Sequence, residues 1–234
     1  MNLRREGRAL RIGHRGAPAL APENTIASLA AALDHGVDLI EIDLIERTGS
    51  LWVAHSLAQI APETPALEQA LRFVSENAPN EVGLILDLKS QGIEAEVVDA
   101  LRRHGLLERA VAASCHGGVL RTLKKLEPAL LRGFSYPRDR VGIAENPLFQ
   151  PFIRAGLAGL RLTLPARVAG LLARGQADAA LLHHTLVSSR LVERCHACGV
   201  AVLAWTVEEE GALDRVLAAG VDGVILNDPR LFDV

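Results

Sequence analysis

The sequence predicts an α/β fold of the (β/α)₈-barrel type, and three observations support this prediction. The chain has 234 residues, a usual length for one such barrel. Short runs rich in Val, Ile and Leu alternate with longer amphipathic runs, which is typical of a parallel sheet covered by helices. Aromatic residues make up only 3% of the chain, so aliphatic side chains must fill the interior, as they do in barrels. No linker or composition shift divides the sequence, and we therefore expect residues 1–234 to form a single domain.

Ten segments have the character of strands, two more than a barrel needs. They are Ala9–Gly13, Asp38–Ile45, Leu51–His55, Val82–Leu88, Ala110–Ser114, Leu130–Ser135, Gly159–Leu164, Ala179–His183, Val200–Val207 and Asp222–Leu226. The run Leu51–His55 follows its predecessor after a short turn around Gly49, so we interpret it as a hairpin partner and not as a barrel strand. The run Gly159–Leu164 fits either a strand or part of a long connection.

Amphipathic runs between these segments predict helices, for example over Asn24–Asp34, Leu67–Asn77, Glu94–Arg103 and Leu186–Ala197. Several of the predicted helices end at a glycine just before the next strand, as helix C-termini commonly do. These glycines are Gly36, Gly105, Gly199 and Gly220.

The charge and the cysteines exclude several classes of function. The formal net charge of −3 argues against a nucleic-acid or anionic-membrane partner. The basic cluster at Arg4, Arg5 and Arg8 is not followed by the apolar segment of a signal peptide, and no apolar run is long enough to span a membrane, so we expect a cytoplasmic protein. Cys195 and Cys198 lack the further ligands of a zinc site, and we expect them to be ordinary thiols.

A histidine and an arginine directly follow the first predicted strand, in Gly13-His14-Arg15-Gly16. Catalytic residues of barrels lie at the carboxyl ends of the strands, so we expect His14 and Arg15 to face the mouth. Histidine exchanges protons near neutral pH, and a guanidinium group can bind phosphate through two parallel hydrogen bonds. The alternative is a surface turn with an incidental histidine.

Glu23 and Asn24 precede the first predicted helix. One interpretation is that Asn24 only caps the helix. The other is that both side chains point into the mouth beside His14. The two interpretations are compatible, since a cap residue at this end of a barrel also lies near the site.

Three carboxylates lie on two predicted strands. Glu41 and Asp43 are two residues apart and therefore share a face, and the apolar residues around them indicate a strand that is buried on both sides. Two buried carboxylates repel each other unless a cation lies between them. Asp87, at the end of another strand, would complete a site for Mg²⁺ or Ca²⁺, and Lys89 would contact a phosphoryl oxygen. A surface-facing pair at Glu41 and Asp43, and a structural pair between Asp87 and Lys89, are the alternatives.

His55 ends the hairpin segment and offers a second proton-transferring group besides His14. Cleavage of a phosphodiester needs one group that activates the nucleophile and another that protonates the leaving alkoxide. The two histidines together can supply both functions.

In this order along the chain, the motifs resemble the glycerophosphodiester phosphodiesterase family. Further similarity lies in the last two predicted strands, at Trp205-Thr206-Val207 and Gly220-Val221-Asp222-Gly223-Val224-Ile225. The resemblance implies a TIM-type barrel and hydrolysis of a small-molecule glycerophosphodiester to sn-glycerol 3-phosphate and an alcohol. It implies that His14 and His55 are the acid–base pair, that Glu41, Asp43 and Asp87 bind one divalent cation, Mg²⁺ or Ca²⁺, and that the substrate is bound by Arg15, Lys89, Glu23, Asn24 and Trp205.

The sequence departs from the family pattern at several positions. Asp87 stands where the family usually has Glu, Ser56 where it usually has Asp, and Asn227 where it usually has an acidic residue. The insertion that usually follows the second histidine is largely missing, because only about ten residues separate His55 from the helix that opens near Pro65. We therefore expect a less enclosed substrate.

Two other functions fit the same motifs. The first is a lipid phosphodiesterase, such as a lysophospholipase D or a phospholipase C, although the short segment after His55 offers little apolar rim for an acyl chain. The second is a catalytically degenerate barrel that binds a phosphoester. The presence of both histidines and all three carboxylates argues against this second alternative.

Overall fold

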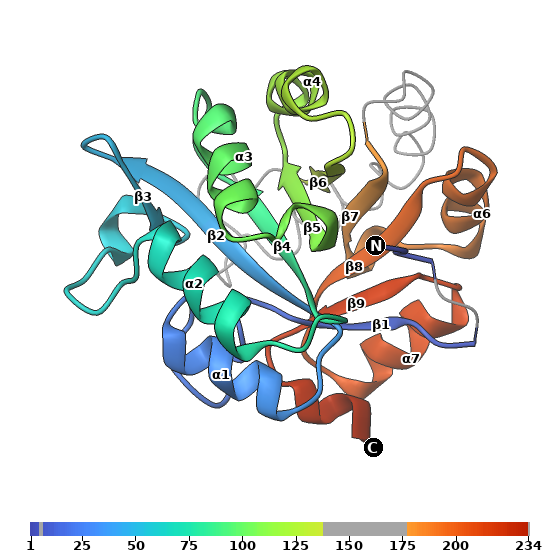
Figure 1. Cartoon of the computed structure of the whole chain (residues 1–234). Coiled ribbons are helices and arrows are strands. Elements are labelled where there is room, and N and C mark those ends of the chain that lie inside the picture. The colour runs from blue at the N-terminus through green and yellow to red at the C-terminus, as the bar shows by residue number, and fades with distance from the viewer. Residues whose placement is uncertain (5–6, 138–176, 234) are drawn as a thin grey trace.

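A computed structural model of the chain describes residues 1–4, 7–137 and 177–233, and in this part of the chain eight parallel strands close into a barrel (Figure 1). The strands are β1 (Leu10–Gly13), β2 (Leu39–Arg47), β4 (Gly83–Leu88), β5 (Ala110–Ser114), β6 (Leu131–Tyr136), β7 (Ala179–His183), β8 (Ala201–Val207) and β9 (Gly223–Leu226). Each pairs with its neighbours in the order β1-β9-β8-β7-β6-β5-β4-β2, and pairing of β1 with β2 closes the ring. The predicted barrel is confirmed.

The remaining strand, β3 (Ser50–Val53), lies outside the ring and pairs antiparallel with the end of β2. This confirms that the third predicted segment is a hairpin partner. The strand ends at Val53, so His55 lies two residues beyond it and not at its last position. The other surplus segment, Gly159–Leu164, lies outside the described residues.

Helices surround the barrel (Figure 1). They are α1 (Ile26–Asp34), α2 (Leu67–Asn77), α3 (Glu94–Arg103), α4 (Gly117–Leu126), α6 (Ser189–Ala197) and α7 (Glu210–Ala218), with short 3₁₀ turns η1 (Leu57–Gln59), η2 (Leu107–Arg109), η5 (His184–Leu186) and η6 (Pro229–Asp233). All four glycines predicted to end helices have a positive φ, from 65° to 83°. In the described ranges, no helix has the length and apolar character needed to cross a membrane.

The alternation of side chains along the strands divides the core into two layers. Ile40, Ile42 and Leu44 point outward into the larger layer, between the strands and the helices. Leu39 points into the smaller layer inside the barrel, whose fully buried members come from β2 and six other strands. Glu41 and Asp43 alternate with the outward residues and therefore lie on the inner face.

Three aspartates at the amino ends of strands make the same contact at the bottom of the barrel. Each stands one residue before its strand and accepts a hydrogen bond from a backbone N–H of a neighbouring strand: Asp38 from Arg11 (2.8 Å), Asp178 from Arg132 (2.8 Å) and Asp222 from Val202 (2.7 Å). A basic side chain pairs with each carboxylate, as Arg8 does with Asp38 at 2.6 Å. These contacts fix the register of the sheet at the end of the barrel opposite the predicted site.

Candidate active site

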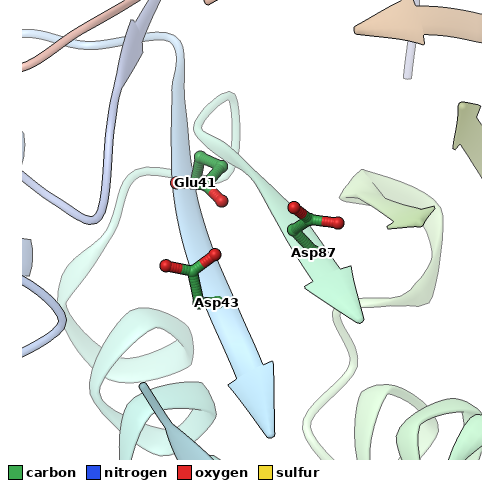
Figure 2. A group of neighbouring side chains, drawn as sticks. All are labelled: Glu41, Asp43 and Asp87. Carbon is green, nitrogen blue, oxygen red and sulfur yellow. The ribbon is translucent and has the colours of Figure 1, made fainter. Parts of the chain in front are cut away.

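The three carboxylates predicted to bind a cation converge at the inner face of the barrel (Figure 2). Glu41 and Asp43 lie on β2, and Asp87 lies on β4, directly opposite Asp43 in the strand register. One oxygen from each side chain lies within 4.8 Å of the other two. Strand spacing and side-chain alternation therefore produce the arrangement that the sequence predicted.

The charges of this cluster are unevenly balanced. Burial and, to a smaller extent, the charge of the nearby Asp43 together raise the pKa of Glu41 to about 8. Burial also acts to raise the pKa of Asp43, but Lys89, His55 and Arg15 outweigh it and hold this pKa well below the usual range. The positive charge around the buried Glu41 is thus too small to balance its ionised form. An all-oxygen set with such a group fits a hard divalent cation.

Lys89 and Arg15 lie beside the carboxylates. The ammonium group of Lys89 is 2.7 Å from Asp43 and 2.5 Å from Asp87. The Nε of Arg15 is 2.9 Å from Asp43, and its Nη1 is 2.9 Å from Glu23. The two cationic side chains predicted to bind phosphate therefore share one carboxylate, Asp43.

The turn after β1 depends on Gly13, Gly16 and Ser28. Arg15 has a φ of +49°, and its backbone N–H donates to Glu41 at 3.0 Å. Gly16 has a φ of +88°, and a Cβ there would overlap Ser28. The hydroxyl of Ser28 donates to the carbonyl of Arg15 and accepts from the N–H of Ala17, both at 2.8 Å. This turn places the Arg15 backbone against the acidic cluster while the side chain reaches Asp43.

The two histidines lie next to different carboxylates of the cluster. The Nε2 of His14 is 4.0 Å from Glu41, and its Nδ1 is 2.6 Å from the side-chain oxygen of Asn227. Burial, assisted by the charge of Arg15, lowers the pKa of His14 to about 4. The Nδ1 of His55 is 3.3 Å from Asp43 and 3.1 Å from the guanidinium of Arg15.

Glu23 and Asn24 contact Arg15 and Asp43 of the site. Asn24 does not cap the helix, which corrects that interpretation; the cap is Thr25, whose hydroxyl accepts from the N–H of Ser28. Instead, the side chain of the buried Asn24 donates to the Asp43 carboxylate at 3.2 Å and accepts from the backbone N–H of Asp43 at 3.3 Å. The φ of Asn24 is +57°. Glu23 pairs with Arg15 and accepts from Gln59 at 2.8 Å. The side chains contact residues of the site, and in the described ranges neither lines the cavity.

A cavity of about 490 Å³ opens above the carboxylates. Polar residues of the site line it together with apolar residues, among them Ile45, Leu57, Leu88, Leu181, Trp205 and Ile225. The indole nitrogen of Trp205 is buried without a hydrogen-bond partner in the described structure, and its ring contacts His183 edge to face. Trp205, predicted to contact the substrate, is one of the residues that line the cavity.

Several residues of this region were not predicted. Cys115 and His116 line the cavity just beyond β5, and the rule that strand ends face the mouth would have found them. Ser28 lies inside a helix, where a serine carries no signal of its role in a distant turn. Glu208 is joined to the site through Asn227, to which it is hydrogen-bonded at 2.5 Å.

Fold and site define an enzyme of the barrel phosphodiesterase class. A family model described as the glycerophosphoryl diester phosphodiesterase family matches residues 14–48 and 63–231. The chain belongs to this family, and the predicted resemblance is confirmed. The unmatched interval, residues 49–62, contains β3, His55 and the segment where the family's usual insertion is largely missing.

Individual relatives agree with this assignment. A glycerophosphodiester phosphodiesterase from Caldanaerobacter subterraneus subsp. tengcongensis is 27% identical, and the match covers 95% of this chain and 96% of the relative. A protein of known structure from Silicibacter pomeroyi has a TM-score of 0.77 at 22% identity, covering 99% and 96% of the two chains. A phosphodiesterase from Oleispira antarctica, solved in complex with the product sn-glycerol-3-phosphate, has a TM-score of 0.70 at 23% identity, covering 95% and 96%. The two structures establish the shared fold.

Proposed function

We propose that this chain hydrolyses glycerophosphodiesters to sn-glycerol 3-phosphate and an alcohol, with one bound divalent cation, Mg²⁺ or Ca²⁺. The observation that carries the proposal is the convergence of three carboxylates, two cationic side chains and two histidines on one cavity. The Oleispira antarctica relative was solved with sn-glycerol-3-phosphate as its product, which supports the same compound as one of the two products here.

The positive side chains are the proposed phosphate ligands. Arg15 offers a planar fork that can hold two phosphate oxygens, while Lys89 offers a compact charge to a third. Glu23 and Asn24 contribute by fixing Arg15 and Asp43, and Trp205 forms an apolar wall for the organic part of the substrate.

Glu41, Asp43 and Asp87 would hold the cation, because they are the described carboxylates that share one center. When bound there, a divalent cation stabilises negative charge on a phosphoryl oxygen and on the attacking oxygen. Around it, Lys89 and Arg15 orient the phosphate relative to the two histidines.

The histidines divide the proton transfers. With a pKa lowered to about 4, His14 is neutral at physiological pH and can accept the proton of the nucleophile. His55, on the hairpin side of the cavity, is the proposed acid that protonates the departing alcohol. The same pair serves attack by the glycerol hydroxyl, which gives a cyclic phosphate that water then opens, and direct attack by water.

The test is an assay of the purified protein with glycerophosphocholine, Mg²⁺ or Ca²⁺, in which released glycerol 3-phosphate is measured by a coupled dehydrogenase. We expect turnover that is lost in His14→Ala and His55→Ala. His104→Ala is the matched control, since this histidine pairs with Glu68 on the outer surface. Absence of glycerol 3-phosphate with every cation would refute the proposal.

A lipid substrate is a second candidate, supported by the walls of the cavity. Leu57, in the short segment after His55, is exposed despite its size and lines the cavity, as Ile45 does. The sequence had offered little apolar rim here, and Leu57 supplies part of one. Comparing kcat/KM for lysophosphatidylcholine and glycerophosphocholine decides between the candidates, and Leu57→Ser should lower only the value for the lipid.

A formal net charge of −3 supports a small-molecule substrate and argues against nucleic acid as a partner. Location in the cytoplasm stays a proposal, which fractionation of the native host would test.

A further inference from the structure

Three neighbouring strands end at the same level of the barrel beside His14. The register pairs Gly13 of β1 with Leu226 of β9, and Leu226 with Val207 of β8. Each of these residues is the last of its strand. The next residues along the chain, His14, Asn227 and Glu208, therefore stand side by side at the mouth.

These three residues form a continuous series of hydrogen bonds. The amide nitrogen of Asn227 donates to a carboxylate oxygen of Glu208 at 2.5 Å. The amide oxygen of Asn227 faces the Nδ1 of His14 at 2.6 Å. The backbone adds to this placement, because His14 donates its N–H to the carbonyl of Leu226 at 2.9 Å, and Ala19 donates to the carbonyl of Asn227 at 3.2 Å.

The donors and acceptors of this series allow only one arrangement. A carboxylate can only accept hydrogen bonds, so the NH₂ group of Asn227 must face Glu208. The amide oxygen must then face His14, and since this oxygen can only accept, Nδ1 of a neutral His14 must carry the hydrogen. The other ring nitrogen, Nε2, is left with its lone pair and points toward the carboxylate cluster, 4.0 Å from Glu41.

We propose that Glu208 and Asn227 are positioning residues that hold His14 in the Nδ1–H tautomer and so present a basic Nε2 to the reacting atoms. The proposal rests on the proposed function for its catalytic meaning, because it explains how His14 can act as the base. The tautomer itself is a property of the resting protein. Asn227, a departure from the family's usual acidic residue, can perform this task only if its amide is oriented, and Glu208 orients it.

Nitrogen-15 NMR of the full-length protein with labelled histidines tests the tautomer without any assay of activity. Spectra are recorded at about pH 8, well above the ordinary pKa of histidine, and the signal lost in His14→Gln identifies His14. We expect wild type to show protonated Nδ1. In Glu208→Ala the amide is free to turn, and we expect a mixture of both tautomers. Glu209→Ala is the matched control, since this exposed neighbour makes no side-chain cap contact with α7 and should leave the spectrum unchanged.

A double variant provides a rescue. In Glu208→Ala/Asn227→Asp, the new carboxylate accepts from either oxygen and needs no orientation, so the Nδ1–H tautomer should return. Protonated Nε2 in wild type, or identical spectra for Glu208→Ala and Glu209→Ala, would overturn the proposal.

Kinetics separate this inference from the proposed function. If half of the His14 side chains adopt the other tautomer, kcat should fall about twofold, and further if the ring also loses its orientation, with KM little changed. Asn227→Leu removes the acceptor and should lower kcat by about 10- to 100-fold, as loss of a partner behind a reactive side chain commonly does. Spectra as expected from a protein that releases no glycerol 3-phosphate would leave the tautomer assignment standing and reject the hydrolase. An active enzyme with the opposite tautomer would reject the tautomer assignment and leave the proposed hydrolysis standing.

Discussion

The Nε of Arg15 lies 2.9 Å from Oδ2 of Asp43. A side chain proposed to bind phosphate is thus ion-paired with a carboxylate proposed to bind the cation. A divalent cation at Asp43 weakens the attraction of this carboxylate for Arg15 and leaves the guanidinium available to another anion.

The first prediction is that the cation and the phosphate group bind cooperatively. Titration calorimetry with sn-glycerol 3-phosphate should give a higher affinity in the presence of Ca²⁺ than in EDTA, by about 5- to 150-fold for a typical coupling between two sites. Ca²⁺ affinity should rise by the same factor when sn-glycerol 3-phosphate is present. Arg15→Lys, which retains the charge but loses the fork, should reduce this coupling. Equal affinities with and without the cation would contradict the prediction.

The second prediction concerns pH. The pKa of Glu41 is raised to about 8 in the metal-free fold, so the folded state retains a proton that the unfolded chain loses near its ordinary pKa. The contribution of Glu41 to stability is therefore fully present below the unfolded pKa and is lost as pH rises towards 8. Because a cation must displace this proton, cation affinity should rise over the same interval.

Thermal unfolding from pH 5 to about pH 9 measures both effects. The increase in Tm on adding Ca²⁺ should grow with pH and level off above about 8. Glu41→Gln carries no titrating group and should remove this part of the pH dependence. A Ca²⁺-induced shift that stays constant with pH would exclude Glu41 from the cation site.

The third prediction concerns Asp87, the shorter carboxylate at a position where the family usually has Glu. Asp87→Ala should lower cation affinity by about 10- to 100-fold. Asp87→Glu should retain or improve it, because the longer arm still reaches the other two carboxylates. If Asp87→Ala and wild type require the same cation concentration for half-maximal activity, Asp87 serves only to hold Lys89, with which it pairs at 2.5 Å.

The fourth prediction separates the two histidines. Either alanine variant should lose about 10²- to 10⁴-fold in kcat, and the double variant should lose far less than the product of the two, because both groups serve one displacement. The pH profile should be bell-shaped, with limbs that belong to the coupled pair. When the substrate is a p-nitrophenyl phosphodiester, p-nitrophenolate departs without being protonated. His55→Ala should therefore affect cleavage of this substrate little, and His14→Ala should still affect it strongly. Equal losses from both variants on both kinds of substrate would reject this division of tasks.

The fifth prediction concerns the bottom of the barrel. Asp38→Ala removes acceptors from Arg8 and from the backbone N–H of Arg11, which should lower the free energy of unfolding by about 1–3 kcal/mol. Turnover at 25 °C should stay unchanged, since the site lies at the other end of the strands. The exposed Asp34, at the end of α1, supplies the control Asp34→Ala, for which little change in Tm is expected. A loss of turnover that matches the loss of stability would indicate that the two ends are coupled.

The sequence predicted the barrel and the acidic cluster because both follow from local periodicity. Glu41 and Asp43 share a face in any strand, and the apolar residues around them indicated that this face is buried. The support of Asp43 by Asn24 was missed, because it depends on a left-handed backbone that makes Thr25 the helix cap. The contact of His14 with Asn227 joins residues 213 positions apart, and only the strand register brings them together.

The position of β3 has a consequence for how such an enzyme can diversify. The proposed cation and phosphate ligands lie on strands of the closed ring or within two residues of their ends, whereas His55 follows β3, which lies outside the ring. We therefore expect that residues 48–65, apart from His55, can change in length and composition while the eight-stranded pairing stays intact. Exchanging this hairpin between members of the family should transfer preference for the departing alcohol and leave recognition of glycerol phosphate in place. If the proposed roles hold, the segment that contacts the departing alcohol can be exchanged while the barrel residues proposed to bind the cation and the phosphate stay the same.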